Sequence, residues 1–161
     1  MRAERGFTLI EILVVVIIIG ITVGFALLAF GDFGASRRVI VNTEQLSSYI
    51  KLVQQRAVLE NNTLGIRVNG EGYSTFRLER GLWQQMPAKS IYHTRTFPNN
   101  MVVNVQSLAQ YNNKRPDVVV DASGGISSFA IKLGTKQNPT IATLLGNTDG
   151  QLVIQLPKTS T

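Results

Sequence analysis

An unbroken apolar run near the N-terminus limits what this chain can fold into. Residues 12–31 carry no charged side chain, and 20 residues of α-helix rise about 30 Å, which matches the hydrocarbon core of a bilayer. A secretory signal peptide has a shorter apolar stretch of about 7–15 residues. The length therefore favours a retained membrane span, which could be an ordinary anchor or a processed one.

A carboxylate stands directly before this run, at Glu11. A charge at the bilayer centre costs roughly 2.5–3.5 kcal/mol even on the lenient insertion scale. Neither a signal peptide nor an ordinary anchor accounts for it. One alternative, which the position alone leaves open, is that Glu11 lies at a helix end and reaches back to the lipid headgroups.

The residues around Glu11 form a recognisable signal. A short leader, residues 1–6, ends in Gly6; Phe7 follows, and Glu11 is the fifth residue after that junction. This order resembles the class III signal of type IV pilins and type II secretion pseudopilins. The resemblance implies that prepilin peptidase cleaves between Gly6 and Phe7 and methylates the new Phe7 amine. Loss of the leader would lower the side-chain net charge from +6 to +5.

The same resemblance implies a role for Glu11 in assembly. A lone carboxylate in lipid is unfavourable, but opposite the positive N-terminal amine of an adjacent subunit it forms an ion pair in low dielectric. Gly20 and Gly24 have the GxxxG spacing, which places two small residues on one helix face. Glycine is also common in membrane helices without this role. We expect helix packing at Gly20 and Gly24 as a weaker prediction.

The spacing of apolar residues changes twice after the membrane span. Residues 36–60 predict an amphipathic helix that faces a core and ends at Asn61-Asn62, since apolar residues recur at steps of three and four: Leu46, Tyr49, Ile50, Val53 and Ala57. The rest of the chain shows alternating patterns separated by Gly, Asn and Pro. Strands are expected at 64–68, 73–78, 82–84, 101–105, 118–120, 128–133, 141–145 and 152–156.

These elements predict an α+β fold. A long N-terminal hydrophobic helix spans the membrane, extends into the soluble part and packs on a C-terminal antiparallel β-sandwich-like domain, as in pilins. The expected parts are a cleaved leader at 1–6, a transmembrane or filament-core helix at 7–31, its amphipathic continuation at 32–60 and a β-rich domain at 61–161.

The location of the chain follows from the same elements. Basic residues on the two sides of the span are nearly balanced, so they do not fix its orientation. The folded content after residue 60 favours the C-terminal part as the side that crosses. We expect a single-pass protein of the bacterial inner membrane with its C-terminal domain in the periplasm.

No catalytic, cofactor or metal motif accompanies this fold. The chain has no cysteine, which excludes disulfides, thiolate catalysis and Cys-ligated zinc. His93 is the only histidine, so a multi-histidine metal site is excluded and His93 is interpreted as a surface or packing residue. Asp117, Asp121 and Asp149 lie too far apart in sequence for a loop-type calcium motif. We expect neither enzyme activity nor a cofactor.

A more diffuse similarity covers the rest of the chain. The strand Gly65-Ile66-Arg67-Val68, a hairpin leading to Trp83, the turn at 121–127 and the closing Asp149-Gly150-Gln151-Leu152 resemble H-type minor pseudopilins of type II secretion. Related minor type IV pilins share this GspH/FimT-like domain. The resemblance implies a structural subunit at or near the pseudopilus tip that supports export of folded proteins across the outer membrane. Its implied partners are prepilin peptidase, other minor and major pseudopilins, the inner membrane and secreted proteins.

The alternative is a minor type IV pilin that serves pilus assembly or DNA uptake. A net charge of +6 permits contact with nucleic acid, but the basic residues are scattered. DNA-binding relatives have closely set arginines between the last two strands, whereas residues 146–151 have none and include Asp149. Trp83 and Phe129 are interpreted as core residues rather than as platforms for stacked bases. We therefore expect no binding of nucleic acid.

Overall fold

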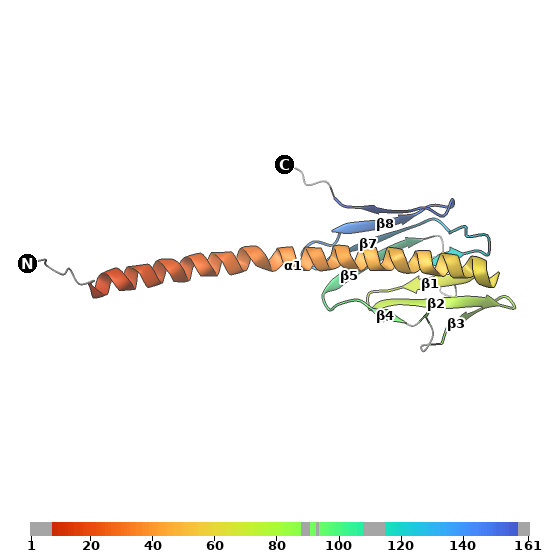
Figure 1. The fold of residues 1–161 in the computed structure, drawn as a ribbon, viewed down its shortest axis with the longest axis horizontal. Coiled ribbons are helices and arrows are strands. Elements are labelled where there is room, and N and C mark those ends of the chain that lie inside the picture. The colour runs from red at the N-terminus through yellow and green to blue at the C-terminus, as the bar shows by residue number, and fades with distance from the viewer. Residues whose placement is uncertain (1–7, 88–90, 93, 108–114, 158–161) are drawn as a thin grey trace, which may run out of the picture. The chain divides into compact units, whose positions relative to one another are not determined.

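The computed structural model describes residues 8–87, 91–92, 94–107 and 115–157, apart from the side chains of 28–33. One helix, α1, runs over Leu9–Glu60 (Figure 1). The chain divides into two compact units, Met1–Ala35 and Ser36–Thr161, and α1 contributes to both. The expected leader, residues 1–6, lies outside the described residues.

A Schellman motif ends α1 at the predicted place. Asn61 has φ 49°, in the left-handed region that asparagine tolerates better than most residues. Its N–H donates to Val58 O at 3.2 Å, and Asn62 N–H donates to Ala57 O at 3.0 Å. These bonds satisfy carbonyls that the last turn leaves without partners, so Asn61-Asn62 terminates the helix as the sequence predicts.

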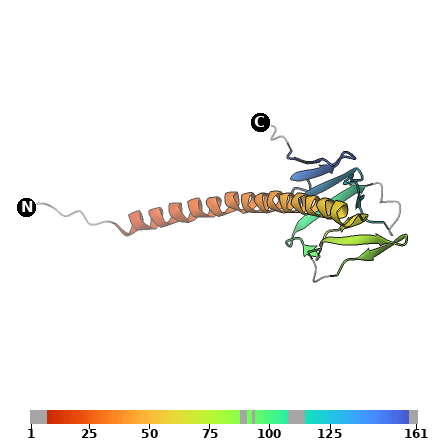
Figure 2. The same cartoon turned by 45° about the vertical axis from the view of Figure 1, so that its right-hand side comes forward.

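The second unit contains two antiparallel sheets. The first has the order β3-β2-β1-β6, with β4 also paired to β2, and the second has the order β5-β7-β8-β9. In both views the C-terminal half of α1 lies along the sheets, with the yellow-green strands on one side and the blue strands on the other (Figures 1 and 2). The strands are β1 (Leu64–Val68), β2 (Gly72–Glu79), β3 (Leu82–Gln85), β4 (Arg95–Thr96), β5 (Met101–Ser107), β6 (Val118–Val120), β7 (Phe129–Thr135), β8 (Ala142–Gly146) and β9 (Leu152–Gln155).

The predicted α+β class and antiparallel sheets are confirmed. The bounds of β1 and β6 agree with the sequence prediction, and the other predicted strands differ at one or both ends. For example, β7 begins at Phe129 rather than at Ser128. The two-residue strand β4 was not predicted, because Arg95-Thr96 offers no alternation of apolar and polar residues.

The predicted stripe of α1 forms the centre of the core. Leu46, Ile50, Val53 and Ala57 are 0% exposed and Tyr49 is 4% exposed. The stripe packs with residues of both sheets, including Leu64, Ile66, Val118, Val120, Ile131, Leu133 and Leu144. It also extends further upstream than predicted, to Val39 and Thr43. The buried Thr43 hydroxyl is satisfied because it donates to Val39 O at 2.9 Å.

Candidate functional site

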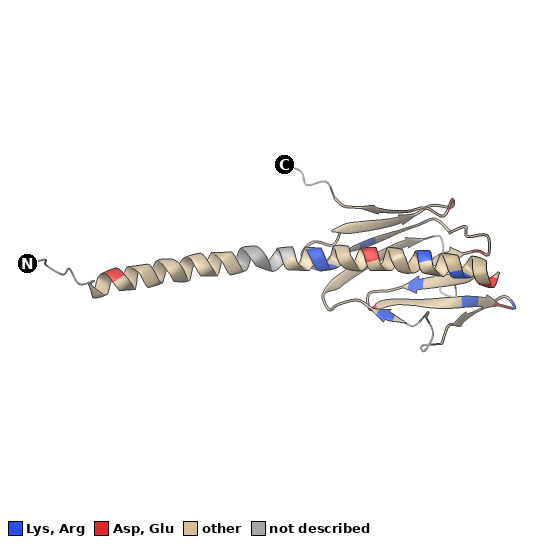
Figure 3. Cartoon of the chain, in the orientation of Figure 1, with Lys and Arg blue, Asp and Glu red and all other residues tan. Residues whose placement is uncertain are grey.

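The N-terminal part of α1 presents apolar side chains on every face. The segment Leu9–Leu27 has a mean hydropathy of 2.8 and is 0% buried. At 1.5 Å per residue, its 19 residues rise about 28 Å. It is the one helix in the described part of the chain that is long and apolar enough to cross a membrane. Glu11 is its only charged residue (Figure 3).

Glu11 lies in the first turn of α1 and folds back toward the start of the helix. Thr8 N–H donates to Glu11 Oε2 over a long distance of 3.5 Å, and Glu11 N–H donates to Thr8 O at 3.1 Å. Thr8 and Glu11 have the T-x-x-E spacing of a capping box, in which the glutamate accepts from the N-cap N–H. A carboxylate there also interacts favourably with the positive end of the helix dipole. Glu11 therefore has a partner within its own chain.

Gly20 and Gly24 leave one face of this segment open. A methyl group at either position would meet no atom of the described residues within 4 Å, so no contact among them requires glycine here. Nearby, Thr22 Oγ1 donates to Ile18 O at 2.6 Å and to Ile19 O at 3.0 Å, which keeps its hydroxyl satisfied in an apolar environment. The packing role predicted for the two glycines stays a prediction.

Other predicted site residues lie outside the described part. Gly6 and Phe7, the expected cleavage junction, belong to the first seven residues, and His93 is also outside the described residues. Their expected roles stay predictions.

The three aspartates considered for calcium each accept main-chain hydrogen bonds. Asp117 accepts from Val68 N–H at 2.9 Å. Its half-buried position raises the pKa of its carboxyl above the ordinary value. Asp149 accepts from Gln151 N–H at 3.0 Å. In the residues that the structure describes, no three Asp, Glu or His side chains come together to hold a metal.

Asp121 organises the turn between β6 and β7. Its Oδ1 accepts from the Ser123 hydroxyl at 2.5 Å, from Ser123 N–H at 2.8 Å and from Gly125 N–H at 3.0 Å. These hydrogen bonds, that of the Ser123 hydroxyl above all, lower the pKa of the Asp121 carboxyl. The carboxylate is thus used to shape the turn.

Gln54 of α1 connects this turn to the one between β8 and β9. Its side-chain amide donates to Gly124 O at 2.6 Å and to Gly150 O at 3.4 Å. Gly124 and Gly150 have φ 91° and 85°, in the left-handed region that favours glycine. The turn between β8 and β9 is therefore held against α1 and presents Asp149 to solvent.

The two aromatic residues interpreted as core differ in burial. Phe129 is 5% exposed and belongs to the core, which confirms its interpretation. Trp83 is only half-buried, so its core assignment was wrong. It lies on β3, which pairs with β2 only, over the backbone of Gly65: a methyl group at Gly65 would lie 2.9 Å from Trp83 Cζ3. An edge position with a partly open face leaves Trp83 in contact with solvent.

A second polar cluster fixes the C-terminal end of α1. Glu60 Oε2 lies 2.7 Å from Arg77 Nη2 of β2, and Tyr92 OH donates to Glu60 Oε1 at 2.5 Å. Burial, followed by the hydrogen bond and negative charge of Glu60, raises the pKa of Tyr92 above its ordinary value. Tyr92 is therefore a neutral donor at pH 7.

Comparison with known proteins shows a similarity to pseudopilins. Residues 1–27 match the family described as the prokaryotic N-terminal methylation motif. Type II secretion system protein H of Pseudomonas aeruginosa is 29% identical over 148 residues, which cover 84% of this chain and 86% of that protein. The chain is thus similar to the H-type minor pseudopilins of type II secretion.

Solved structures share the pseudopilin fold. The minor pseudopilin EpsH from the type 2 secretion system of Vibrio cholerae matches with a TM-score of 0.62 at 14% identity, over 75% of this chain and 98% of that chain. The solution structure of E. coli GspH matches with a TM-score of 0.63 at 17% identity, over 78% of this chain and 93% of that chain. These solved structures show that the chain has the pilin-like fold, and its apolar helix Leu9–Leu27 is long enough to anchor it in a membrane.

Two contacts of this chain were not predicted from its sequence. The Thr8–Glu11 capping contact could have been found from the T-x-x-E spacing. The stacking of Arg95 on Tyr49, with Arg95 Cζ 5.7 Å from the ring centroid, had no sequence signal. It depends on where β4 lies, and the sequence did not predict β4.

Proposed function

We propose that this chain is a minor subunit at or near the tip of a type II secretion pseudopilus, where it supports export of folded proteins across the outer membrane. The observation that carries the proposal is the exposed apolar helix Leu9–Leu27 with a single carboxylate, Glu11, in its first turn. None of this surface is buried by the described residues, and it is suited to lipid and then to other helices. The relative from Pseudomonas aeruginosa, whose name is type II secretion system protein H, supports the choice of system.

Maturation in this proposal uses the predicted junction. Prepilin peptidase cleaves between Gly6 and Phe7 and methylates the Phe7 amine, and the match of residues 1–27 to the methylation motif supports this step. The domain that follows α1 lies in the periplasm, and the other minor and major pseudopilins are the assembly partners.

In the proposed assembly Glu11 exchanges one partner for another. Within one chain its carboxylate accepts from Thr8 N–H at 3.5 Å, which is a weak contact at that length. A methylated amine from a neighbouring subunit is a cation, and an ion pair in low dielectric is stronger than this hydrogen bond when its geometry is good. Glu11 is thus least satisfied in the lone subunit and best satisfied in the filament.

Two substitutions at Glu11 test this exchange in the bacterium that encodes the chain. Glu11→Gln keeps an acceptor for Thr8 N–H but removes the charge, whereas Glu11→Ala removes both. We expect both variants to be cleaved normally and both to lose pseudopilus assembly and secretion. Glu71→Ala, at an exposed carboxylate in the second unit, is the control. Secretion by Glu11→Gln at the level of the unchanged chain would refute the ion pair and leave only a capping role.

The observations on this chain do not favour DNA uptake. In the described structure the turn between β8 and β9 carries Asp149 on its exposed side, and residues 146–151 include no basic residue. Phosphate binding requires clustered cations.

A further inference from the structure

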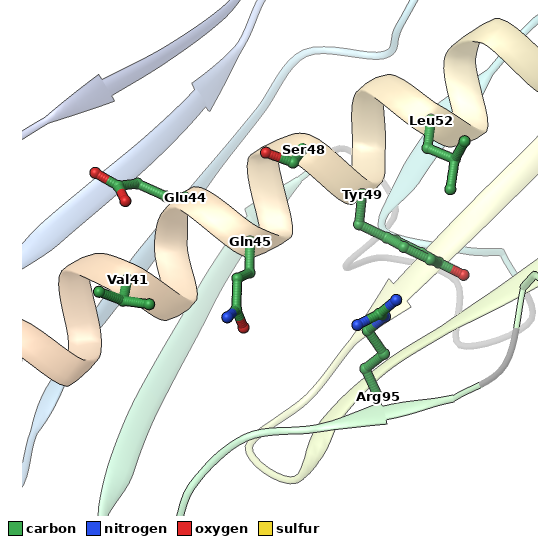
Figure 4. Close-up of a pocket in the computed structure, with 7 residues that line it drawn as sticks. All are labelled: Val41, Glu44, Gln45, Ser48, Tyr49, Leu52 and Arg95. Carbon is green, nitrogen blue, oxygen red and sulfur yellow. The ribbon is translucent and has the colours of Figure 1, made fainter.

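A groove on the second unit joins α1 to the short strand β4. It has a volume of about 390 Å³. Its helix side includes Val41, Gln45, Ser48 and Leu52, which lie on neighbouring turns, and Arg95 of β4 closes the opposite side (Figure 4). Val41 is 39% exposed, so an apolar contact surface lies beside a cation.

The backbone that carries Arg95 is held in place on several sides. Gly72 of β2 pairs with Thr96, and a methyl group at Gly72 would overlap the carbonyl of Arg95. Phe97 N–H donates to Glu71 O at 2.8 Å. The Phe97 ring is 7% exposed and packs against Tyr73, with ring centroids 5.5 Å apart. An exposed side chain thus extends from a firmly positioned main chain.

The guanidinium of Arg95 is also positioned, although no carboxylate in the described part of the chain pairs with it. Its Cζ lies 5.7 Å from the centroid of the Tyr49 ring, within the range of a cation–π contact. No carboxylate of the described residues forms an ion pair with Arg95. Figure 4 shows Gln45 and Tyr49 reaching from α1 toward Arg95, whereas the carboxylate of Glu44 points away from it.

We propose that the α1–β4 groove, with Arg95 as its charged anchor, docks a neighbouring pseudopilin of different sequence through a carboxylate flanked by apolar side chains. This inference rests on the proposed function, since it names a contact within that assembly. Arginine that is oriented in advance binds a carboxylate with less loss of side-chain entropy than a free one. The apolar part of the groove buries the methylene groups that carry this carboxylate, or the apolar side chains next to it.

Charge decides against a second copy of this chain as the occupant. The chain has a net charge of +6, and +5 without its leader. Two copies therefore repel one another, whereas an acidic pseudopilin is attracted. The groove of this chain would thus be filled by a subunit of different sequence.

The absence of cysteine from the chain allows a direct test by cross-linking. Ser48→Cys in the full-length chain is labelled with a thiol-reactive benzophenone and illuminated in cells that assemble the pseudopilus. The labelled Lys136→Cys, on the exposed turn after β7, is the matched control. We expect Ser48→Cys to cross-link to an acidic pseudopilin of the same system, and Lys136→Cys not to do so.

Charge reversal then tests the anchor. Adding Arg95→Glu should lower the Ser48 cross-link by about tenfold, since an attractive contact becomes a repulsive one. Arg95→Lys should retain part of it, and Lys136→Glu should leave it unchanged. Normal processing and an unchanged near-ultraviolet spectrum would show that the Arg95→Glu chain folds.

Three results would overturn the groove as a docking site: a cross-link to a second copy, a yield that is insensitive to Arg95→Glu, or no cross-link. Secretion by the same cells separates this failure from failure of the proposed function. Normal secretion without the cross-link would refute docking at the groove and leave the proposed function standing. If the unchanged chain does not support secretion, both the proposed function and docking at the groove are refuted.

Discussion

The buried hydrogen bond between α1 and β2 gives a quantitative prediction. Tyr49 OH and Thr75 Oγ1 lie 2.7 Å apart, and the two residues are 4% and 0% exposed. Tyr49→Phe removes one hydroxyl and leaves the Thr75 hydroxyl buried without this partner. A buried polar group left unsatisfied costs about 1–3 kcal/mol. We expect the free energy of unfolding to fall by that amount.

The paired substitution separates this cost from general disruption. Tyr49→Phe with Thr75→Val removes both hydroxyl groups and keeps similar volumes, so no polar group is left unsatisfied. Removing both partners of a hydrogen bond is often nearly neutral. We therefore expect the double variant to be more stable than Tyr49→Phe alone.

The assay is thermal unfolding of the Ser36–Thr161 unit, which contains the whole described core. For a domain of this size 1 kcal/mol shifts Tm by about 4 °C, so Tyr49→Phe should lower it by about 4–12 °C. A decrease of less than about 1 °C would refute the claim that Thr75 depends on this hydroxyl. A double variant less stable than Tyr49→Phe would refute it as well.

Two further predictions concern stability. Burial raises the pKa of the Asp117 carboxyl, so the folded state loses stability as pH rises through that pKa. Asp117→Asn keeps an acceptor for Val68 N–H but lacks the charge. Its Tm, relative to that of the unchanged chain, should therefore be higher at pH 7 than at about pH 3. The same Tm difference at both pH values would contradict this prediction. Gly146→Ala places a methyl group in the Phe129 ring and should cost about 1–3 kcal/mol or more in denaturant unfolding, whereas Gly70→Ala, where the space is open, should cost less.

The parts of the fold that follow local rules could be predicted from the sequence. The stripe containing Leu46 and Ile50 repeats with the helical period, and Asn61 tolerates the left-handed conformation that ends a helix. Strands β1 and β6 are short and rich in β-branched residues, and all their residues except Arg67 and Val119 are buried.

The groove could not be predicted in this way. The strand β4 has two polar residues, and it pairs with β2 because Gly72 permits close approach of the main chain of Arg95. Such a contact depends on the position that β4 takes beside β2 in the folded chain, which local sequence does not determine. For the same reason the half-buried position of Trp83, on an edge strand, was missed.

Processing at the Gly6–Phe7 junction distinguishes a pseudopilin from an ordinary membrane anchor. Intact mass spectrometry of the protein extracted from the membrane measures the first residue and its modification together. We expect a chain that begins at Phe7 and carries one N-terminal methyl group, in agreement with the methylation motif at residues 1–27. A chain that retains Met1, or one that has lost the apolar run as a cleaved signal peptide, would contradict this expectation.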